Sequence, residues 1–402
     1  MDTASQPQPL DIPVHIQERE TLTEEDIWLC QGPTVWSSRR FVGAPSFYPV
    51  YRAGDHFSFS PVYLMALTGD VQVDRGYVAC IEAREREGVP YYSGIKTIDR
   101  RISRVGGPMA HQASITRTAE YVRQMASAMV EDVRSAEAAA GDATNAVLCG
   151  GKDSLNLLLL PWKNPVVAVS AAPNFPLVRE FIERNRLGID CLELKDDDTS
   201  AVSQEVLYNA CHDDLRHCRW VGELRALATA KRGNLVLWKG QLGDVFLSPF
   251  WRSYAHCTYR CQRMLQSARS LCLELGLRVG HRGLAEAQQR RLFVDMWHRG
   301  AMMQGVYMSI VRAVSGCLVL SGYHGHHVRR VVSSADLISA VEADVRPWIG
   351  RELLGRDVVY PIANPSPPPS GFRARLSDPV TWLAQAQAAG LVIAHDDSSA
   401  IR

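Results

Sequence analysis

The chain has 402 residues, of which 46% are hydrophobic and 22% are charged, and its formal net charge is +1. This length is enough for two or three ordinary domains, and the composition is that of a soluble globular protein. A charge near zero argues against a dedicated nucleic-acid-binding protein. The start of the chain lacks the pattern of a signal peptide, and no apolar run is long enough to span a bilayer. We therefore expect a cytoplasmic protein with no membrane partner, and the sequence leaves a homodimer open.

The ten cysteines are scattered along the chain. This spacing predicts free thiols in a reducing compartment rather than a disulfide framework. No repeated CxxC pattern, which is typical of structural zinc, is present. Cys211 and Cys218 lie beside His212 and His217, which leaves a metal site open at that one place.

The front of the chain is predicted to contain an arm and a small domain. Residues 1–25 are expected to form a flexible arm, and residues 26–120 a smaller β-rich domain. Within that domain, residues 47–51 and 56–60 are strand-like and the intervening turn contains Gly-Asp, which predicts a β-hairpin. Residues 117–139 then show helical periodicity.

Strand-like and helix-like segments alternate from residue 145 onward. Strands are predicted at 146–148, 166–170, 191–194 and 235–238, and helices at 155–160, 177–185 and 219–231. This alternation predicts an α/β fold with a doubly wound parallel sheet. After about residue 255 the pattern is mainly helical, and residues 361–370 are rich in Pro and Ser, which predicts a loop. We therefore expect residues 121–402 to form one α/β domain with a helical C-terminal part.

The segment Cys149-Gly150-Gly151-Lys152-Asp153-Ser154 follows a predicted strand and precedes a predicted helix. Glycines let backbone N–H groups approach an anion, and the start of a helix adds positive partial charge. Lys152 adds a full charge, and Ser154 can donate to a phosphate oxygen. Asp153 suits a phosphate site if Mg²⁺ lies between the two. The segment therefore predicts a magnesium–polyphosphate site, and an ordinary strand–turn–helix is the alternative.

This segment resembles the SGGxDS pyrophosphate loop of the N-type ATP pyrophosphatases, with Cys149 where that family usually has Ser. It has neither the GxxxxGK[ST] nor the GxGxxG spacing of other phosphate loops. The resemblance implies ATP as ligand, a sheet of the adenine nucleotide alpha hydrolase type, and a loop that holds the β- and γ-phosphates. We include Val169 and Ser170, at the end of the next predicted strand, among the nucleotide-binding residues.

A second glycine-containing turn, Lys239–Phe246, follows the apolar strand at 235–238. It resembles the SGEGxDELFGGY segment of asparagine synthetases, in which the Asp holds Mg²⁺ together with the Asp of the first loop. Gly240 matches the first Gly of that segment and Asp244 matches its Asp. The resemblance therefore implies that Asp153 and Asp244 bind the magnesium.

Two positions in this turn depart from the family. Lys239 replaces the Ser of the motif, and Gln241 replaces its Glu. β-Lactam synthetases have Tyr at the Glu position, as part of a base that deprotonates the amine. Gln241 cannot act as a base, whereas Lys239 is a candidate for contact with phosphate. An ordinary strand–turn–helix with a capping Asp is again the alternative.

The front of the chain also resembles this family in part. Asparagine synthetases begin with a glutaminase whose nucleophilic Cys follows the initiator Met, and Met1-Asp2 lacks that Cys. Residues 48–66 resemble the later hairpins of the glutaminase, and residues 91–98 resemble its closing stretch. We expect an inactive remnant, so the amine must come from free ammonia, a partner or the substrate itself. β-Lactam synthetases and lasso-peptide cyclases use the substrate's own amine.

A polar segment follows the apolar run at 317–320. Tyr323 and His324 are candidates for a base, and Arg329 and Arg330 for an anion site. A strand–turn–helix with surface histidines is the alternative.

A rival alignment makes residues 321–323 the second phosphate motif, but it puts His326 at the metal position and is disfavoured. The Lys with which the family stabilises the reacting oxyanion has no match at residues 367–372. Arg373 or Arg375 could substitute for it. The ATP half of the motif set is therefore better preserved than the amide-forming half.

These features predict an ATP-dependent carbon–nitrogen ligase of the asparagine synthetase and β-lactam synthetase type. It would use ATP and Mg²⁺ to adenylate the carboxylate of a small molecule or peptide, which an amine then attacks. A nucleotide-binding regulatory protein without turnover is the alternative, favoured by Gln241 and the missing Lys. A tRNA thiolase that uses Cys149 is a third hypothesis, against which the near-zero charge argues.

Overall fold

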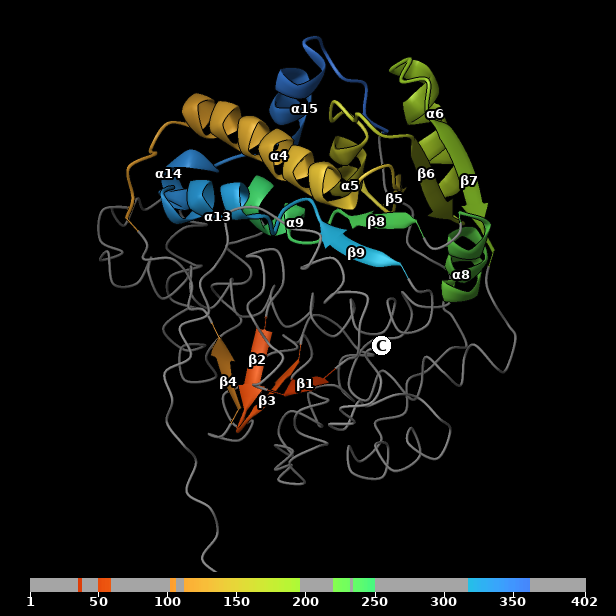
Figure 1. Cartoon of the computed structure of the whole chain (residues 1–402). Helices are drawn as coiled ribbons and strands as arrows, with labels where there is room; N and C mark the ends of the chain where they lie inside the picture. The colour runs from red at the N-terminus through yellow and green to blue at the C-terminus, as the bar shows by residue number, and fades with distance from the viewer. Residues whose placement is uncertain are drawn as a thin grey trace, which may run out of the picture.

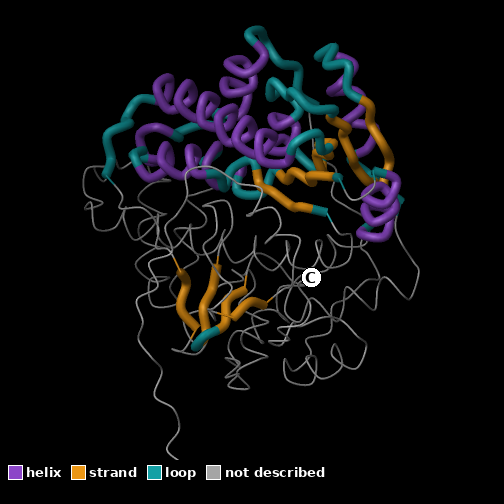
Figure 2. The backbone as a smooth tube through the Cα atoms, viewed as in Figure 1, coloured by secondary structure: helices purple, strands orange, loops and turns teal. Residues whose placement is uncertain are grey.

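The computed structural model describes residues 35–37, 50–58, 102–105, 112–195, 220–231, 234–249 and 317–361. The described residues form two sheets, which Figures 1 and 2 show as separate groups of strands. The strands are β1 (Val35–Ser37), β2 (Val50–Ala53), β3 (His56–Ser58), β4 (Ile102–Val105), β5 (Thr144–Leu148), β6 (Val166–Ala171), β7 (Asp190–Leu194), β8 (Leu235–Lys239) and β9 (Leu318–Ser321). The helices are α4 (Thr118–Ala140), α5 (Lys152–Leu157), α6 (Phe175–Arg184), α8 (Val221–Ala230), α9 (Gly243–Leu247), α13 (His326–Ser333), α14 (Leu337–Ala340) and α15 (Arg346–Leu354).

The front sheet is antiparallel, with the strand order β1-β3-β2-β4. The predicted hairpin is confirmed for residues 50–58, where β2 pairs with β3 and Ala53 lies opposite His56. Gly54 has a φ of 57° in the connecting turn, a backbone conformation that glycine adopts without strain. The stretch at 91–98 and the cysteine–histidine group at 211–218 lie outside the described residues, so the glutaminase resemblance and that metal site stay predictions.

The second sheet has five parallel strands in the order β7-β6-β5-β8-β9. Helices alternate with these strands along the chain, so the predicted α/β fold with a parallel sheet is confirmed. The helix predicted at 155–160 instead forms α5 at Lys152–Leu157. It starts earlier because the chain enters the helix directly after Gly151, which puts Asp153 and Ser154 in the first turn.

Strand β5 lies at the centre of this sheet. From β5 the chain adds β6 and β7 on one side, then returns to add β8 and β9 on the other side. The strand order therefore reverses between β5 and β8. In open α/β sheets, ligands bind outside the carboxyl ends of the strands at such a reversal point.

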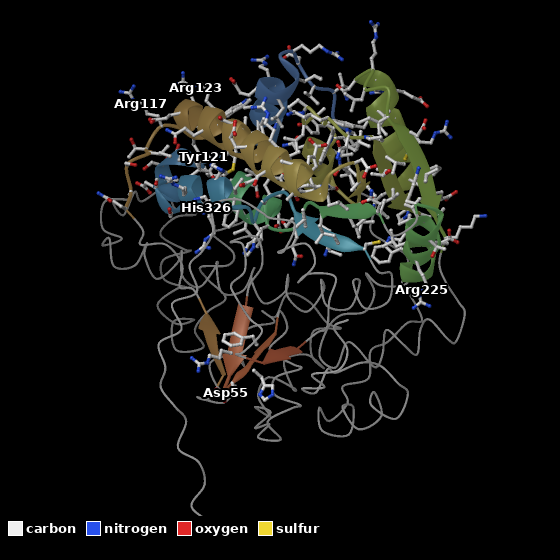
Figure 3. All side chains as sticks on the ribbon, viewed as in Figure 1. Asp55, Arg117, Tyr121, Arg123, Arg225 and His326 are labelled. Carbon is white, nitrogen blue, oxygen red and sulfur yellow. The ribbon has the colours of Figure 1, made fainter. Side chains whose placement is uncertain are left out.

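Helix α4 packs against α13, α14 and α15, and in Figure 1 it crosses the sheet beside α5 and α15. The Tyr121 hydroxyl donates to the Phe246 carbonyl at 2.9 Å, which joins α4 to the end of α9. Figure 3 labels Tyr121 and also His326, which begins α13 beneath α4. Burial raises the pKa of Tyr121 well above its ordinary value, so its hydroxyl stays neutral between the packed helices.

The core between the helices and the sheet is mainly apolar and includes a buried chain of polar groups. The indole N–H of Trp238 donates to Asn145 at 2.8 Å, and the Asn145 amide donates to Glu137 at 2.9 Å. Glu137 also accepts backbone N–H groups of Lys163 and Asn164. These bonds satisfy polar groups that would otherwise be costly to bury. No helix in the described part of the chain combines the length and apolar character that a bilayer crossing needs.

Candidate functional site

The first turn of the candidate site follows β5. The Cys149 N–H donates to the Val169 carbonyl at 2.8 Å, which extends the β5–β6 pairing by one bond into the turn. The Ser154 hydroxyl accepts the N–H groups of Gly150 and Gly151 at 3.1 and 3.3 Å and donates to the Gly151 carbonyl at 2.8 Å. A phosphate that binds Ser154 must therefore replace one of these bonds.

The turn after β8 lies directly against this first turn. Leu148 pairs with Lys239, so both turns begin at the same level of the sheet. A Cβ atom on Gly240 would lie 2.4 Å from the Ser154 nitrogen, and a Cβ on Gly243 would lie 2.5 Å from the Asp153 Cβ. Both distances are too short for any side chain. The two glycines therefore allow the turns to touch.

Asp153 and Asp244 interact electrostatically across this contact. Burial raises the pKa of Asp153 to about 6, Arg346 opposes the rise, and the charge of Asp244 adds to it. Burial also raises the pKa of Asp244, against the opposing Val245 N–H and Arg346. Raised pKa values are expected for carboxyl groups in a partly dry site, because burial disfavours the charged form and a neighbouring negative charge adds to the effect at Asp153.

Arg346, the first residue of α15, reaches this pair of carboxylates. Its NH1 atom donates to Asp153 Oδ1 at 3.0 Å. Its Nε and NH2 atoms donate to the two oxygens of Asp344 at 2.7 and 2.8 Å. Asp153, Asp244 and Asp344 thus interact with a single guanidinium. When all are ionised, two negative charges remain, which is the charge that one divalent cation neutralises.

Side-chain hydrogen bonds from neighbouring elements fix the backbone around Asp153, Gln241 and Arg346. The Tyr323 hydroxyl donates to the Asp153 carbonyl at 2.7 Å, and the Ser321 hydroxyl of the same strand–turn donates to the Gln241 carbonyl at 3.0 Å. The Arg346 carbonyl accepts the Asn156 amide at 3.1 Å and the Tyr360 hydroxyl at 3.1 Å. Partly buried hydrogen bonds therefore fix the backbone at Asp153, at Gln241 in the second turn and at Arg346.

Other predicted site residues lie around the two turns with varied exposure. Val169 and Ser170 are buried in β6, and the Ser170 hydroxyl donates to the Cys149 carbonyl at 2.6 Å. Contact with a nucleotide would therefore come from their backbone. Lys152 begins α5 and is partly exposed. Lys239 is partly buried, and its ammonium donates to the Gln241 side chain at 3.3 Å.

The predicted base candidates Tyr323 and His324 are fully buried. Burial raises the pKa of Tyr323 well above its ordinary value, so its hydroxyl is neutral and acts here as a donor to the first turn. The alternative of surface histidines is wrong for His324 and His326, both of which lie inside. A role of Tyr323 or His324 as base stays a prediction.

Asp153 and Asp244 are suited to magnesium. The residues that the structure describes contain no group of three or more His, Cys, Asp or Glu side chains arranged to hold a metal. Magnesium does not require such a cage, because it commonly binds one or two carboxylates together with phosphate oxygens and water. Two largely buried carboxyl groups with raised pKa values, one of them raised in part by the charge of the other, fit that pattern.

Sequence reasoning did not find the roles of Arg346, Asp344, Asn156 and Tyr360. Arg346 and Asp153 are 193 residues apart in the chain, and no spacing rule links them. The available local signal was Arg346-Pro347 at the start of a helix, since proline is favoured in the first turn. Arg373 and Arg375, the substitutes suggested for the family's Lys, lie outside the described residues.

Neither the models of known protein families nor the curated protein sequences give a match to this chain. Membership of the asparagine synthetase family therefore stays an expectation from the two turns.

Proposed function

We propose that this chain binds ATP at the carboxyl ends of β5 and β8 and cleaves it to AMP and pyrophosphate, thereby activating a carboxylate for attack by an amine. The observation that carries the proposal is the contact of the two turns, in which Gly243 leaves no room for a Cβ beside Asp153. The strand order adds support, because it reverses between these two strands. The fold we propose is the adenine nucleotide alpha hydrolase type.

Each group in the site has a proposed task. Asp153 and Asp244 would hold magnesium, which neutralises charge on the leaving pyrophosphate. Backbone N–H groups at the start of α5 and the Lys152 ammonium would bind phosphate oxygens. The hydrogen bonds that Tyr323 and Ser321 donate would keep both turns in place before substrate arrives. Binding acid and ATP side by side would lower the barrier by orienting the reacting atoms.

The decisive experiment is ATP–pyrophosphate exchange with a panel of small-molecule and peptide carboxylates. We expect exchange that depends on one class of acid, and we expect Asp153→Asn and Asp244→Asn each to lower it at least 100-fold. Asp357→Asn is the matched control, because this exposed aspartate pairs with Arg351 away from the turns. Full exchange in either site variant would overturn the two-carboxylate arrangement.

A nucleotide-binding regulatory protein is the second candidate. Gln241 favours it, because a neutral amide that accepts a bond from Lys239 stands where β-lactam synthetases carry part of a base. ATP binding measured by calorimetry, together with no pyrophosphate release for any acid, would support this candidate. The thiolase hypothesis is weakened, since burial raises the pKa of Cys149 and disfavours the reactive thiolate.

A further inference from the structure

The Arg346 guanidinium has more N–H donors than its two aspartate partners use. A guanidinium carries five N–H groups. One on Nε and one on NH2 are directed to Asp344, and one on NH1 is directed to Asp153. This leaves one N–H on each terminal nitrogen for a further acceptor. The side chain is 17% exposed, so it is partly accessible to a ligand.

Arg346 is also held in a fixed position relative to the first turn. Its carbonyl accepts the amide of Asn156, which lies two residues after Ser154 in α5. Tyr360 donates to the same carbonyl and also to the Asn156 side chain. The two oxygens of Asp344 bind one edge of the guanidinium and direct its NH1 atom toward the turn. A preorganised donor of this kind binds an anion without losing much side-chain freedom.

The partner of NH1 in the structure is the carboxylate that we expect to bind magnesium. A divalent cation on Asp153 would repel the guanidinium and take the oxygen that NH1 now contacts. The NH1 donors then need another acceptor at the same place. A phosphate oxygen that arrives with the cation has the right charge, and arginine matches phosphate geometry with two parallel N–H bonds.

We propose that Arg346 is a phosphate-binding residue of this site and that it exchanges Asp153 for a phosphate oxygen when the nucleotide binds. The inference rests on the proposed function, because the exchange requires a magnesium–polyphosphate between the two turns. Asp344 is the positioning residue, because its bonds to Nε and NH2 keep the guanidinium near the first turn after magnesium binds Asp153. The same exchange makes Arg346 a competitor of any free divalent cation for Asp153.

The first test measures ATP affinity by calorimetry, with magnesium and with EDTA. We expect Arg346→Met to weaken ATP binding about 10-fold or more with magnesium and clearly less with EDTA, where Arg346 stays bonded to Asp153. Arg346→Lys should weaken binding less than Arg346→Met, because Lys keeps the charge but not the fork. Arg351→Met is the matched control, since Arg351 lies on the same helix but is exposed and pairs with Asp357. It should bind ATP like the wild type.

The second test measures Mn²⁺ binding without nucleotide by electron paramagnetic resonance. We expect Arg346→Met to bind Mn²⁺ several-fold more tightly than the wild type, because the competing guanidinium is gone. Unchanged Mn²⁺ affinity would overturn the exchange. If thermal melting shows that Arg346→Met does not fold, Arg346→Lys carries the ATP test, and wild-type affinity in that variant would count against the proposal.

The outcomes separate this inference from the proposed function. If the wild type binds ATP and Arg346→Met binds it with the same affinity, the role of Arg346 is wrong and the proposed nucleotide site is unaffected. Wild-type protein that does not bind ATP overturns both. Weaker ATP binding in Arg346→Met, with Arg351→Met unchanged, supports both.

Discussion

The starts of α5 and α13 both follow a glycine-containing turn at the end of a parallel strand, yet their first turns are filled differently. At α13 the backbone N–H groups of His327 and Val328 donate to the two oxygens of Asp132 at 3.0 Å each. Asp132 comes from α4 and is fully buried. At α5 the N–H groups of Gly150 and Gly151 donate to the neutral hydroxyl of Ser154, and Gly150 is exposed.

The difference shows that a glycine turn before a helix predicts an anion site only when the chain's own carboxylate does not fill it. The start of α13 already has its acceptor in the Asp132 carboxyl group, whereas the N–H groups of Gly150 and Gly151 before α5 donate to a neutral hydroxyl. This also disfavours the rival alignment of residues 321–323. In that alignment His326 would bind the metal. However, His326 is buried in α13, which packs against α4, and the preceding strand β9 lies one strand farther from β5 than β8 does.

The largest expected effect comes from removing the Asp132 carboxyl group at the start of α13. At pH 5, Asp132→Ala should lower the free energy of unfolding by about 3 kcal/mol, because two buried N–H groups lose their acceptor and a cavity remains. ATP affinity should stay within about two-fold, since Asp132 lies at the other helix start. Urea unfolding and calorimetry measure the two quantities. Glu131→Ala, an exposed neighbour paired with Arg134, is the control and should change stability by less than about 0.5 kcal/mol.

The stability contribution of Asp132 should also depend on pH. Burial raises its pKa to about 7, against the lowering effect of the His327 and Val328 N–H groups. A raised pKa means that the contribution is complete below the unfolded value and is lost as the pH rises through about 7. The stability difference between wild type and Asp132→Ala should therefore shrink by about 1 kcal/mol per pH unit from pH 5 to 7. A difference that stays constant over this range would show that Asp132 is already ionised in the folded state, because the unfolded group is ionised at these pH values too.

Gly243→Ala should break the contact at the α5 side. The added methyl would lie 2.5 Å from the Asp153 Cβ, so the two turns must move apart. We expect ATP affinity in the presence of magnesium to fall about 10-fold, which corresponds to about 1.4 kcal/mol. Gly150→Ala is the matched variant, because a methyl there meets no atom within 4 Å, and its unfolding free energy should not change. Wild-type ATP affinity in Gly243→Ala would mean that the contact of the turns is not needed for binding.

The smallest expected effect is that of Tyr323→Phe. The hydroxyl donates one partly buried hydrogen bond to the Asp153 carbonyl. Its loss should cost about 1 kcal/mol of unfolding free energy and leave amide synthesis within about five-fold. If amide synthesis instead fell 100-fold while ATP binding stayed intact, Tyr323 would be the base that the sequence suggested, despite its burial.

Most of the parallel sheet could be predicted from the sequence, because its strands are short apolar runs bounded by turn residues. The runs at 146–148 and 235–238 became β5 and β8 with one or two residues added at their ends. The start of α5 was placed three residues too late, since its first turn is polar and periodicity does not register it. Strand order was not predicted at all, because it depends on packing between segments far apart in the chain.

The candidate site could be predicted only in part, because local sequence context identifies some of its residues and long-range packing brings in the others. Asp153 and Asp244 stand out locally, since each follows an apolar strand and two glycines. Arg346 and Asp344 have no such context, and their meeting with Asp153 depends on how α15 packs against α4 and α5. The surface expectation for His324 and His326 is wrong because both are buried, and the polar segment around them gives no local sign of that burial.

The wide separation along the chain of the groups around Asp153 bears on protein synthesis. A ribosome releases Asp153 and Asp244 long before Arg346, and it must also release Tyr360, which supports the Arg346 carbonyl. An emerging polypeptide therefore has both carboxylates but lacks their counter-ion until residue 346 is free. Translation has to pass this point before the aspartates can be neutralised from within the chain.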